Sequence, residues 1–308
     1  MVLRLAAILA VACSALFVDV PAYPETFRVA TYNLEGYLDA PVKGRVMKTP
    51  EARAKVRECI CALHPEVLAL QEMGGVSALE ELRASLKADG LDYPYAEHVS
   101  GFDTNIHVAI LSRFPFTARR PHTNDNFLLS GRRFRVSRGF GEVDIRVNSQ
   151  YCFTLITAHL KSKRVAAQAD ETELRLEEAK LLREKIDACL TANPEANLIV
   201  LGDFNDSRDA PSTRVILGKG RQQLVDTRPA ERNGDDAPGG KSPRELRNVT
   251  WTHFYAAEDT YSRIDFILLS RGMAREWLPA ETYVLTLPNW GLASDHRPIV
   301  ATFEASDK

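Results

Sequence analysis

Leu198-Ile199-Val200-Leu201-Gly202-Asp203-Phe204-Asn205 is a short apolar run that ends in an acid and an amide. Four consecutive aliphatic residues bounded by polar ones indicate a buried strand. Gly202 allows the backbone to approach its neighbours closely, and alternate residues of an extended segment face the same way. Functional side chains often lie on loops at the ends of strands. The stretch therefore predicts a buried strand that delivers Asp203 and Asn205 to a site at its end.

Four further stretches repeat the pattern of an apolar run followed by polar residues. They are Thr31-Tyr32-Asn33-Leu34-Glu35, Leu70-Gln71-Glu72, Thr157-Ala158-His159-Leu160 and Ser294-Asp295-His296-Arg297-Pro298. The carboxylate and amide oxygens of these motifs are hard ligands that suit magnesium or manganese. The two histidines can transfer a proton near neutral pH. The inventory predicts metal-assisted hydrolysis of a phosphate ester.

In their combination and order, these motifs resemble those of the endonuclease/exonuclease/phosphatase superfamily, the deoxyribonuclease-like metal-dependent phosphoesterases. The resemblance runs from about Phe27 to Phe303 and includes the segment SRIDFIL at 262–268. It implies an α/β fold, a four-layered α/β sandwich in which two packed mixed β-sheets are flanked by helices. It also implies a hydrolase that uses Mg2+ or Mn2+ as its cofactor. The substrate stays open, because one fold can carry many activities.

The resemblance implies a metal site built from three of these residues. Glu72 and Asp295 are expected to be the acidic metal ligands, and Asn33 a weak ligand or a phosphate-contacting amide. Each has a structural alternative when taken alone. Glu72 can cap the turn into Gly74, and asparagine is common in turns at strand ends.

Three further residues are expected to contact the reacting phosphate. By resemblance, Asp203 acts close to the attacking water or the leaving oxygen, and Asn205 holds a phosphate oxygen. His159 is expected to bind phosphate and stabilise its charge. We consider Glu97 as the carboxylate that partners His159.

Asp265 is expected to pair with His296. It lies in the otherwise apolar strand expected at 264–269, where an unpaired acid would be costly. The superfamily supplies a histidine as its partner, here His296. Because a carboxylate fixes the imidazole tautomer and raises its basicity, we expect His296 to take a proton from the attacking water. A structural ion pair is the alternative.

Composition indicates an ordinary soluble globular protein. The chain has 308 residues, of which 45% are hydrophobic and 26% are charged, enough for one large α/β domain. We expect this domain to span residues 25–305 and to act as a monomer. The net charge of −2 provides no global attraction to nucleic acid or to an anionic membrane. Any such attraction must come from a local patch.

Residues 1–22 are expected to be a signal peptide. Arg4 precedes the apolar run 5–18, and Val20-Pro21-Ala22 offers small residues for cleavage after Ala22. The apolar run is short for a membrane span. The protein is therefore expected to be secreted or periplasmic. Ala10-Val11-Ala12-Cys13 resembles a lipoprotein cleavage box, so lipid anchoring through Cys13 is the alternative.

Two basic stretches lie beside the motifs. Lys161-Ser162-Lys163-Arg164 directly follows His159, and residues 119–138 contain six arginines (119, 120, 132, 133, 135 and 138) against Asp125. Clustered guanidinium groups suit phosphate, whose oxygens they bind bidentately. Arg135, Arg138 and Lys161 are therefore expected to bind the substrate, possibly a nucleic acid. The alternative for part of this run is a solvated hairpin.

Aromatic residues in the C-terminal part of the sequence do not decide which phosphate ester is the substrate. Trp251, Tyr255, Tyr261 and Trp290 are available to stack on bases or to pack the edge of the core. Ser262 stands where abasic-site repair relatives carry a bulky aromatic, which with export disfavours a repair role. The first hypothesis is therefore an exported phosphodiesterase, a nuclease of low sequence specificity. A phosphomonoesterase or lipid-head-group phosphodiesterase is the second, and a catalytically silent binding module the third.

Strands alternate with helices along the chain, as in a layered α/β fold. The pattern predicts helices at 51–63, 76–88 and 165–190, the first with Thr49 as its cap, and a long surface loop at 229–247. It predicts strands at 27–32, 67–70, 106–112, 151–157, 198–201, 264–269 and 298–303. Cys59, Cys61, Cys152 and Cys189 are expected to be buried free thiols.

Overall fold

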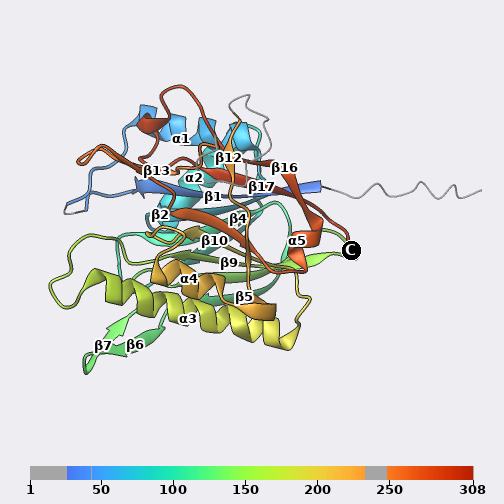
Figure 1. Cartoon of the computed structure of the whole chain (residues 1–308). Helices are drawn as coiled ribbons and strands as arrows, with labels where there is room; N and C mark the ends of the chain where they lie inside the picture. The colour runs from blue at the N-terminus through green and yellow to red at the C-terminus, as the bar shows by residue number, and fades with distance from the viewer. Residues whose placement is uncertain (1–25, 43, 233–247, 308) are drawn as a thin grey trace, which may run out of the picture.

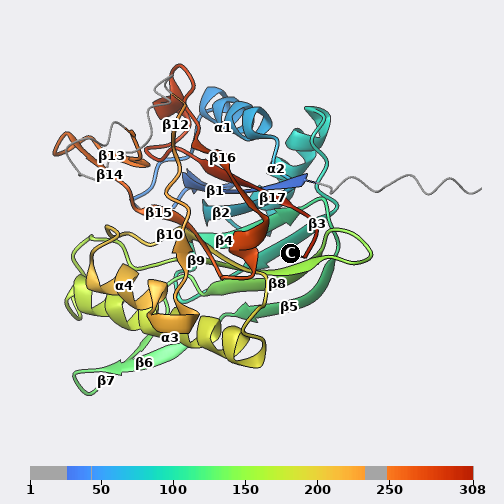
Figure 2. The same ribbon diagram turned by 45° about the vertical axis from the view of Figure 1, so that its right-hand side comes forward.

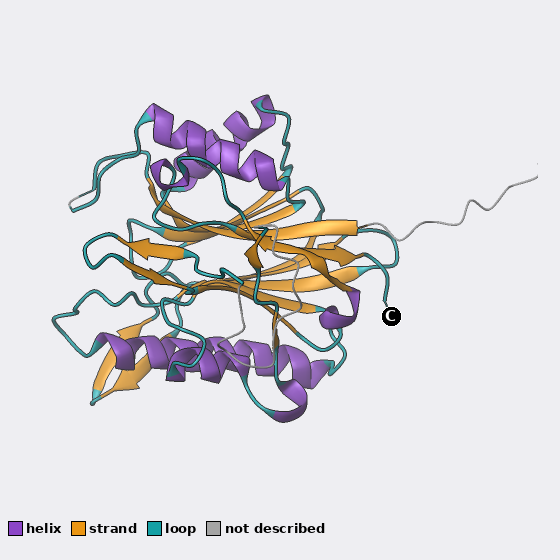
Figure 3. Cartoon of the chain, turned by 45° about the horizontal axis from the view of Figure 1, so that its top comes forward, coloured by secondary structure: helices purple, strands orange, loops and turns teal. Residues whose placement is uncertain are grey.

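The computed structural model describes residues 26–42, 44–232 and 248–307 (Figure 1). The expected signal peptide and most of the expected loop at 229–247 lie outside these residues. The described chain forms two large sheets packed face to face, with helices on their outer faces (Figure 3). Both sheets contain parallel and antiparallel pairs. The four-layered α/β sandwich predicted from the sequence is therefore confirmed.

The first sheet has seven strands, with β1 near its centre. They are β1 (Thr26–Tyr37), β2 (Val67–Met73), β3 (Tyr95–Val99), β4 (His107–Ser112), β12 (Ala230–Glu231), β16 (Trp277–Val284) and β17 (Ile299–Glu304). Their order is β12-β16-β17-β1-β2-β4-β3. β1 runs parallel to β2 and antiparallel to β17. The polar end of β1 therefore lies beside the end of β2 and the start of β17.

The second sheet has six strands, with β10 inside it. They are β5 (Phe116–His122), β8 (Phe140–Arg146), β9 (Cys152–His159), β10 (Leu198–Asp203), β11 (Val225–Asp226) and β15 (Asp265–Leu269). Their order is β11-β15-β10-β9-β8-β5. All six residues of β10 are buried, as the apolar run at 198–201 predicts for an inner strand.

Helices cover the outer face of each sheet (Figures 1 and 3). α1 (Pro50–Leu63) and α2 (Val76–Ala88) cover the first sheet, and α3 (Glu171–Ala192) and α4 (Pro211–Leu217) cover the second. The Thr49 side chain accepts a hydrogen bond from the Ala52 backbone and caps α1, as predicted. Among the described residues, no helix is both long and apolar enough to cross a membrane.

α3 begins six residues later than the predicted start at Val165. The Asp170 carboxylate accepts hydrogen bonds from the backbone N–H groups of Thr172 and Glu173, which satisfies donors of the first turn. Val165 stays in the preceding loop with 91% of its surface exposed. The long loop between β9 and α3 therefore carries Lys161 and Lys163 over the surface.

Apolar side chains fill each boundary between the layers. Between the sheets, Val29, Ile110 and Leu155 belong to one buried cluster, and the ring of Phe27 stacks on that of Phe153 with centroids 5.1 Å apart. Two further clusters lie between the sheets and their helices. Burial of apolar surface from both sheets is the main force that holds them together.

Two hairpins extend from this core. β6 (Asn126–Leu129) pairs with β7 (Arg132–Arg135), and β13 (His253–Tyr255) pairs with β14 (Thr260–Ser262). The β6–β7 hairpin projects past α3 (Figures 1 and 2). Three of its four β7 residues are exposed arginines, so this part of the arginine-rich run forms the solvated hairpin considered above.

The described cysteines are free, but they are not uniformly buried. Cys59 is buried, whereas Cys61 and Cys189 are half-buried. Cys152 is exposed because it is the first residue of β9, at the margin of the sheet. The prediction of free thiols is therefore confirmed, and the prediction that all four are buried is wrong.

Candidate active site

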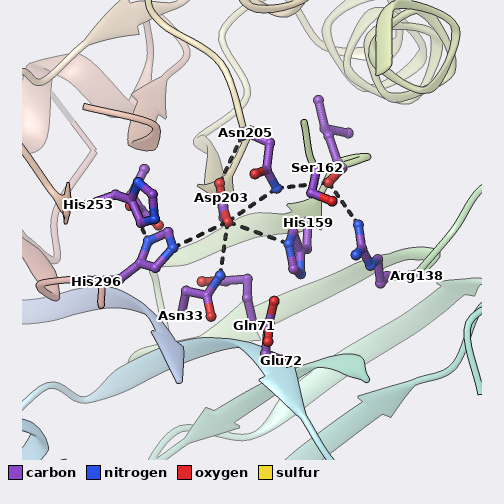
Figure 4. Close-up of polar contacts among 12 residues, drawn as sticks. Asn33, Gln71, Glu72, Arg138, His159, Ser162, Asp203, Asn205, His253 and His296 are labelled. Atoms are coloured by element: carbon purple, nitrogen blue, oxygen red, sulfur yellow. Dashed lines mark hydrogen bonds and ion pairs between the residues drawn. The ribbon is translucent and has the colours of Figure 1, made fainter. Parts of the chain in front are cut away.

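The register of the second sheet places three expected catalytic residues side by side. β10 pairs with β9 on one side and β15 on the other, and Asp203 lies opposite both His159 and Asp265. In the facing sheet, Asn33 of β1 lies opposite Gln71 of β2. The amide of Asn33 donates a 2.9 Å hydrogen bond to Asp203 Oδ2. The two sheets therefore meet in one polar site at this edge (Figure 4).

Asp203 is the centre of this site and is 1% exposed. Its carboxylate accepts hydrogen bonds from the Asn205 backbone at 2.8 Å and the Asn205 side chain at 3.3 Å. His159 Nε2 and His296 Nε2 lie 3.4 and 3.8 Å from Asp203 Oδ2. Burial and the charge of Asp265 raise the pKa of Asp203 to about 7. A carboxyl group with such a pKa can hold or release a proton near neutral pH.

His296 contacts Asp265, as predicted. Its Nδ1 atom lies 2.8 Å from Asp265 Oδ2, and both side chains are buried. Burial alone would lower the pKa of His296. The charge and hydrogen bond of Asp265, with the charges of Asp203 and Asp295, outweigh this effect and raise the pKa to about 10. The imidazole therefore carries a proton near neutral pH in the metal-free site.

His159 differs from His296 in its electrostatic surroundings. Burial, followed by the positive charge of Arg138, lowers the pKa of His159 well below its ordinary value. The ring is therefore neutral. Its Nδ1 atom is buried and has no hydrogen-bond partner within the described part of the chain. A substrate oxygen or a water molecule would satisfy this nitrogen.

Glu97 is not the partner of His159, so that prediction is wrong. Its carboxylate forms an ion pair with Arg119 on the neighbouring edge strand, at 2.5 Å. The acid beside His159 is Asp203. Asp203 reaches this position through the parallel pairing of β9 with β10, which local sequence does not reveal.

Arg138 lies within the site, whereas Arg135 does not. Arg138 is 6% exposed and donates a 2.9 Å hydrogen bond to the Leu160 carbonyl, next to His159 (Figure 4). Its Nε atom is buried and without a hydrogen-bond partner among the described residues. Arg135 lies on the exposed β6–β7 hairpin. The Arg138 Nε atom lies 3.9 Å from Asp103 Oδ2. Of the arginine-rich run, Arg138 is therefore the member whose guanidinium lies beside His159.

Lys161 and Asn205 are positioned by hydrogen bonds to the backbone. The Lys161 ammonium donates to the carbonyls of Ser162 and Arg164 at 3.0 and 2.9 Å. Asn205 donates from its side chain to the Leu160 carbonyl at 3.0 Å. The Lys161 bonds lie within the loop after β9, and the Asn205 bond holds this loop against the loop after β10.

Acidic and basic residues alternate beside this hydrogen-bonded cluster. Glu72 Oε2 binds Arg45 at 2.7 Å, and Glu35 Oε2 lies 3.8 Å from Lys48 Nζ. The same Glu35 oxygen accepts a 3.2 Å hydrogen bond from the backbone of Asp295. Burial and the charge of Asp295 raise the pKa of Glu35. Three carboxylates therefore meet here, with two cations compensating their charge.

This donor set fits a divalent cation. Gathered carboxylates disfavour one another's charge, and an oxygen-coordinated divalent ion relieves that repulsion. Glu72, Asp295 and the unpredicted Glu35 carry such oxygens, but Glu35 and Glu72 belong to neither group of described residues whose ligand atoms lie within 4.8 Å of one another. Asp295 also lies beside His253, whose Nε2 atom is 3.6 Å from its carboxylate. His253, Asp295 and His296 form one group with ligand atoms within 4.8 Å of one another, and Asp203, Asp265 and His296 form another.

Three residues of the site have a strained backbone. Glu35, Glu72 and Asn205 have φ angles of 48°, 57° and 54°, in the left-handed region that non-glycine residues seldom adopt. Such conformations persist where the surrounding structure imposes them, and they are typical of functional sites. Five described non-glycine residues outside the site also have positive φ angles, so the contacts of Glu72 and Asn205, rather than the strain, separate them from ordinary turn residues.

Several residues of the site were not assigned from the sequence. They are Glu35, Arg45, Lys48, Gln71, Thr252 and His253. Gln71 accepts from Thr31 at 3.0 Å and donates to Thr157 at 3.3 Å, which joins the two sheets. Thr252 Oγ1 accepts from the Asp265 backbone. Glu35 and Gln71 stand within the quoted motifs, so the motif pattern was the available signal for them.

The layered fold and this edge cluster of acids and histidines define a phosphoesterase. The sequence profile of the Endonuclease/Exonuclease/phosphatase family matches residues 30–296. The chain belongs to this family, and the resemblance drawn from the motifs is confirmed.

Solved structures of the same fold cover nearly the whole chain. The human nocturnin catalytic domain with bound sulfate has a TM-score of 0.61 and 16% identity, over 91% of this chain and 95% of that one. Truncated TDP2 of Caenorhabditis elegans has a TM-score of 0.59 and 17% identity, over 91% and 98%. Sphingomyelinase C of Streptomyces griseocarneus has a TM-score of 0.56 and 19% identity, over 91% and 100%. No curated protein matches the sequence.

Proposed function

We propose that this chain is an exported, divalent-metal-dependent phosphodiesterase, a nuclease of low sequence specificity that acts as a monomer. The observation that carries the proposal is the buried Asp203 cluster. It combines a protonated histidine paired with Asp265, a neutral histidine and the buried guanidinium of Arg138. Such donors stabilise the negative charge that develops on a phosphoryl group.

The proposed reaction is in-line attack of water on phosphorus. Arg138 and His159 bind non-bridging phosphate oxygens, and Asp203 with Asn205 orients the attacking water or the leaving group. His296 first releases its own proton to solvent, and the neutral imidazole then accepts the proton of the attacking water. Asp265 holds the imidazole by its Nδ1 atom and leaves Nε2 directed toward Asp203.

Glu72 and Asp295, with Asn33 and Glu35 beside them, would hold the divalent ion, which neutralises phosphate charge and assists the leaving oxygen. Asp295 is one source of the negative charge that raises the pKa of His296. We therefore expect the pKa of His296 to fall when the acidic ligands are occupied, which favours its role as a base.

The activity is tested on two small esters and three larger substrates. The chain from residue 23 is assayed with bis-p-nitrophenyl phosphate, p-nitrophenyl phosphate, plasmid DNA, RNA and sphingomyelin. We expect hydrolysis of the diester and of nucleic acid, lost in chelator and restored by Mg2+ or Mn2+. His296→Ala, which should lower kcat by about 10²- to 10⁴-fold, is the control for contaminating enzymes.

The outcomes of this panel separate the alternatives. Selective hydrolysis of p-nitrophenyl phosphate would indicate a phosphomonoesterase, and selective hydrolysis of sphingomyelin a lipid-head-group phosphodiesterase. No hydrolysis with any metal would indicate a silent binding module. Full activity in excess chelator would contradict the proposed metal dependence.

Export is tested separately from activity. The charged, apolar and small-residue segments within residues 1–22 support cleavage after Ala22. Mass spectrometry of the native protein should find an N-terminus near Tyr23 in an extracytoplasmic fraction. An intact Met1 in the cytosol would contradict export, and a lipidated Cys13 would replace secretion with anchoring.

A further inference from the structure

A second basic site lies along the free edge of the second sheet. A cavity of about 530 Å³ borders β11 and is lined in part by Arg208, Arg228 and Arg271, with Asp209 and Asp226. A neighbouring cavity of about 440 Å³ shares Arg271 and Gln223 with the first. It adds Lys219 and Arg221, next to the 3-10 turn η1 (Gly220–Gln222).

The two acids of this cavity are already neutralised by cations. Asp226 accepts two hydrogen bonds from the guanidinium of Arg263, at 2.9 and 2.7 Å, and its carboxylate lies 3.4 Å from Arg208 Nε. Asp209 lies 3.3 Å from Arg208 and 3.7 Å from Arg214. Positive charge therefore remains on the other lining residues.

The remaining cations have few partners. Arg271 donates to the Gly220 carbonyl at a long 3.3 Å. Within the described chain, the side chains of Arg228, Lys219 and Arg221 form no hydrogen bond or ion pair. Five cations and two neutralised acids thus line two adjoining hollows. A guanidinium group without a partner, facing a concave surface, is a strong donor for phosphate oxygens.

The cavity is connected to the catalytic edge through two chain segments. Arg208 follows Asn205 by three residues on the loop after β10. Arg263 precedes Asp265 by two residues, and its guanidinium reaches Asp226 of β11. The Asp226–Arg263 pair therefore links the wall of the cavity to the strand that carries Asp265. This position is separate from Arg138, which lies on the β9 side of Asp203.

We propose that Arg228 and Arg271 form a second anion-binding site that takes a phosphate group, distinct from the phosphate at Asp203. The phosphate belongs either to a strand of nucleic acid that continues from the catalytic edge or to a free phosphorylated small molecule. Both sources present the same chemistry, a dianion or diester with oxygens placed for a guanidinium fork. The neighbouring Lys219 and Arg221 extend the site to a ligand with more than one phosphate.

The test compares a double variant of the cavity with a single control variant elsewhere on the surface. Each substitution replaces arginine by glutamine. R228Q/R271Q removes two of the three arginines that line the first cavity, whereas R146Q removes an exposed arginine at the end of β8. Binding of inorganic pyrophosphate is measured by calorimetry in chelator, and hydrogen exchange locates the protection. We expect wild type and R146Q to show protection at 219–228, and R228Q/R271Q to lose it with at least a tenfold weaker affinity.

A second arm distinguishes the source of the phosphate. Fluorescent oligothymidylate is titrated into the same variants on a His296→Ala background, which prevents turnover. If the ligand is a strand, R228Q/R271Q lowers its affinity and reduces the salt slope by about 1.4, for two contacts at ~0.7 per phosphate of single strand. An unchanged oligonucleotide affinity with lost pyrophosphate binding identifies a free phosphorylated molecule.

The proposal is overturned if R228Q/R271Q binds pyrophosphate and oligonucleotide as R146Q does. It is also overturned if the protection from exchange falls outside the cavity. Hydrolysis of bis-p-nitrophenyl phosphate by R228Q/R271Q reports on the catalytic site independently. A wild-type protein without hydrolytic activity would contradict the proposed function and leave this binding experiment intact.

Discussion

His296 is buried between carboxylates, with Asp265 at its Nδ1 atom and Asp203 near its Nε2 atom. Three buried ionisable groups within one cluster would be costly without mutual compensation. The proton on His296 supplies that compensation in the metal-free protein. At the scale of single residues, stability and catalysis therefore make opposite demands on His296, which must be charged for one and neutral for the other.

The stability of the metal-free protein should fall as pH rises. The folded-state pKa of His296, about 10, exceeds its unfolded value of about 6.5. The folded state therefore binds the proton more tightly, and the contribution is fully present below pH 6.5 and lost as pH rises through about 10. We expect this contribution to be about 1–3 kcal/mol, as for hydrogen bonds to charged groups.

Urea unfolding in chelator at pH 6 and pH 10 measures this effect. The difference in unfolding free energy between the two pH values should be smaller in His296→Gln than in wild type. Equal differences in both proteins would show that His296 is not charged in the folded state.

Arg45 should compete with the metal ion for Glu72. Its guanidinium binds the Glu72 carboxylate at 2.7 Å, so a cation that enters this position must displace it. Arg45→Ala should bind Mn2+ up to about fivefold more tightly, since a partly exposed ion pair contributes roughly 1 kcal/mol or less. Calorimetry with Mn2+ gives the affinities. The control is Arg57→Ala, which removes an ion pair between Arg57 on α1 and Asp89 in the turn after α2. Unchanged or weaker binding by Arg45→Ala alone would exclude competition.

The elements differ in how far local sequence predicts them. β10 and β2 were expected because their apolar runs are continuous. β5 and β8 were not, because they carry charges that are compensated only across the sheet. Arg120 of β5 donates to Asp144 of β8 at 2.9 Å, and His122 lies 2.7 Å from Glu142. These strands are stabilised by side-chain pairs between residues 20 or more positions apart in the sequence. The periodicity of the local sequence therefore does not indicate them.

The candidate site shows the same division. Asp265 was paired with His296 correctly because an acid in an apolar strand needs a partner and the family motif names one. Glu35 and Arg45 were missed because their roles depend on the fold around β1. Glu97 was misassigned because it forms an ion pair with Arg119 of the edge strand β5. The motifs supply most residues of the site, but the role of Glu35, which stands within a motif, and the contacts between distant loops require the structure.

Glu178 of α3 should be a positioning residue for the site. It is 1% exposed and accepts hydrogen bonds from the Ser137 backbone, the Ser137 hydroxyl and the Lys161 backbone, at 2.9, 2.8 and 2.6 Å. Ser137 directly precedes Arg138, and Lys161 lies two residues after His159. Glu178→Ala leaves buried donors unpaired, so the unfolding free energy should fall by about 1–3 kcal/mol.

The catalytic effect of this change distinguishes positioning from general destabilisation. In Glu178→Ala, KM for the diester should rise at temperatures at which the protein remains folded, because Arg138 is no longer held beside Leu160. Glu178→Gln, which keeps an accepting oxygen, should recover part of the loss. The matched control is Glu177→Ala, whose side chain pairs with Lys180 on the surface. An unchanged KM in Glu178→Ala would assign Glu178 a purely structural role.

The whole molecule has a net charge of −2, so attraction to a polyanion depends on where its cations lie. Arg138 lies at the catalytic edge, and Arg132, Arg133 and Arg135 lie on the projecting β6–β7 hairpin (Figure 2). The arginine-rich run therefore separates into the buried Arg138, the exposed surface of the hairpin, and Arg119 and Arg120 of β5, which form ion pairs with acids. The exposed surface of the hairpin is placed to contact the backbone of a long substrate by charge alone.

The hairpin should contribute to nucleic-acid affinity without contributing to the chemistry. Arg132→Ala/Arg133→Ala should reduce the salt slope of duplex DNA binding by about 2, one for each lost phosphate contact. Hydrolysis of bis-p-nitrophenyl phosphate should be unchanged, since this diester is too small to reach the hairpin. Fluorescence polarisation between 50 and 200 mM salt measures the slope. A slope equal to that of wild type would exclude the hairpin from substrate binding and favour a small phosphate ester as the substrate.

A double-mutant cycle on kcat/KM for bis-p-nitrophenyl phosphate tests whether Asp265 and His296 act as one catalytic unit. The wild-type rate should rise with pH through the free-enzyme pKa of His296. His296→Ala should lose several orders of magnitude without unfolding, and Asp265→Asn should lose a substantial part of the same activity. The double variant should be little worse than His296→Ala, because residues that act as a unit are not additive. Fully multiplicative losses would show that the two residues act independently and would contradict the account.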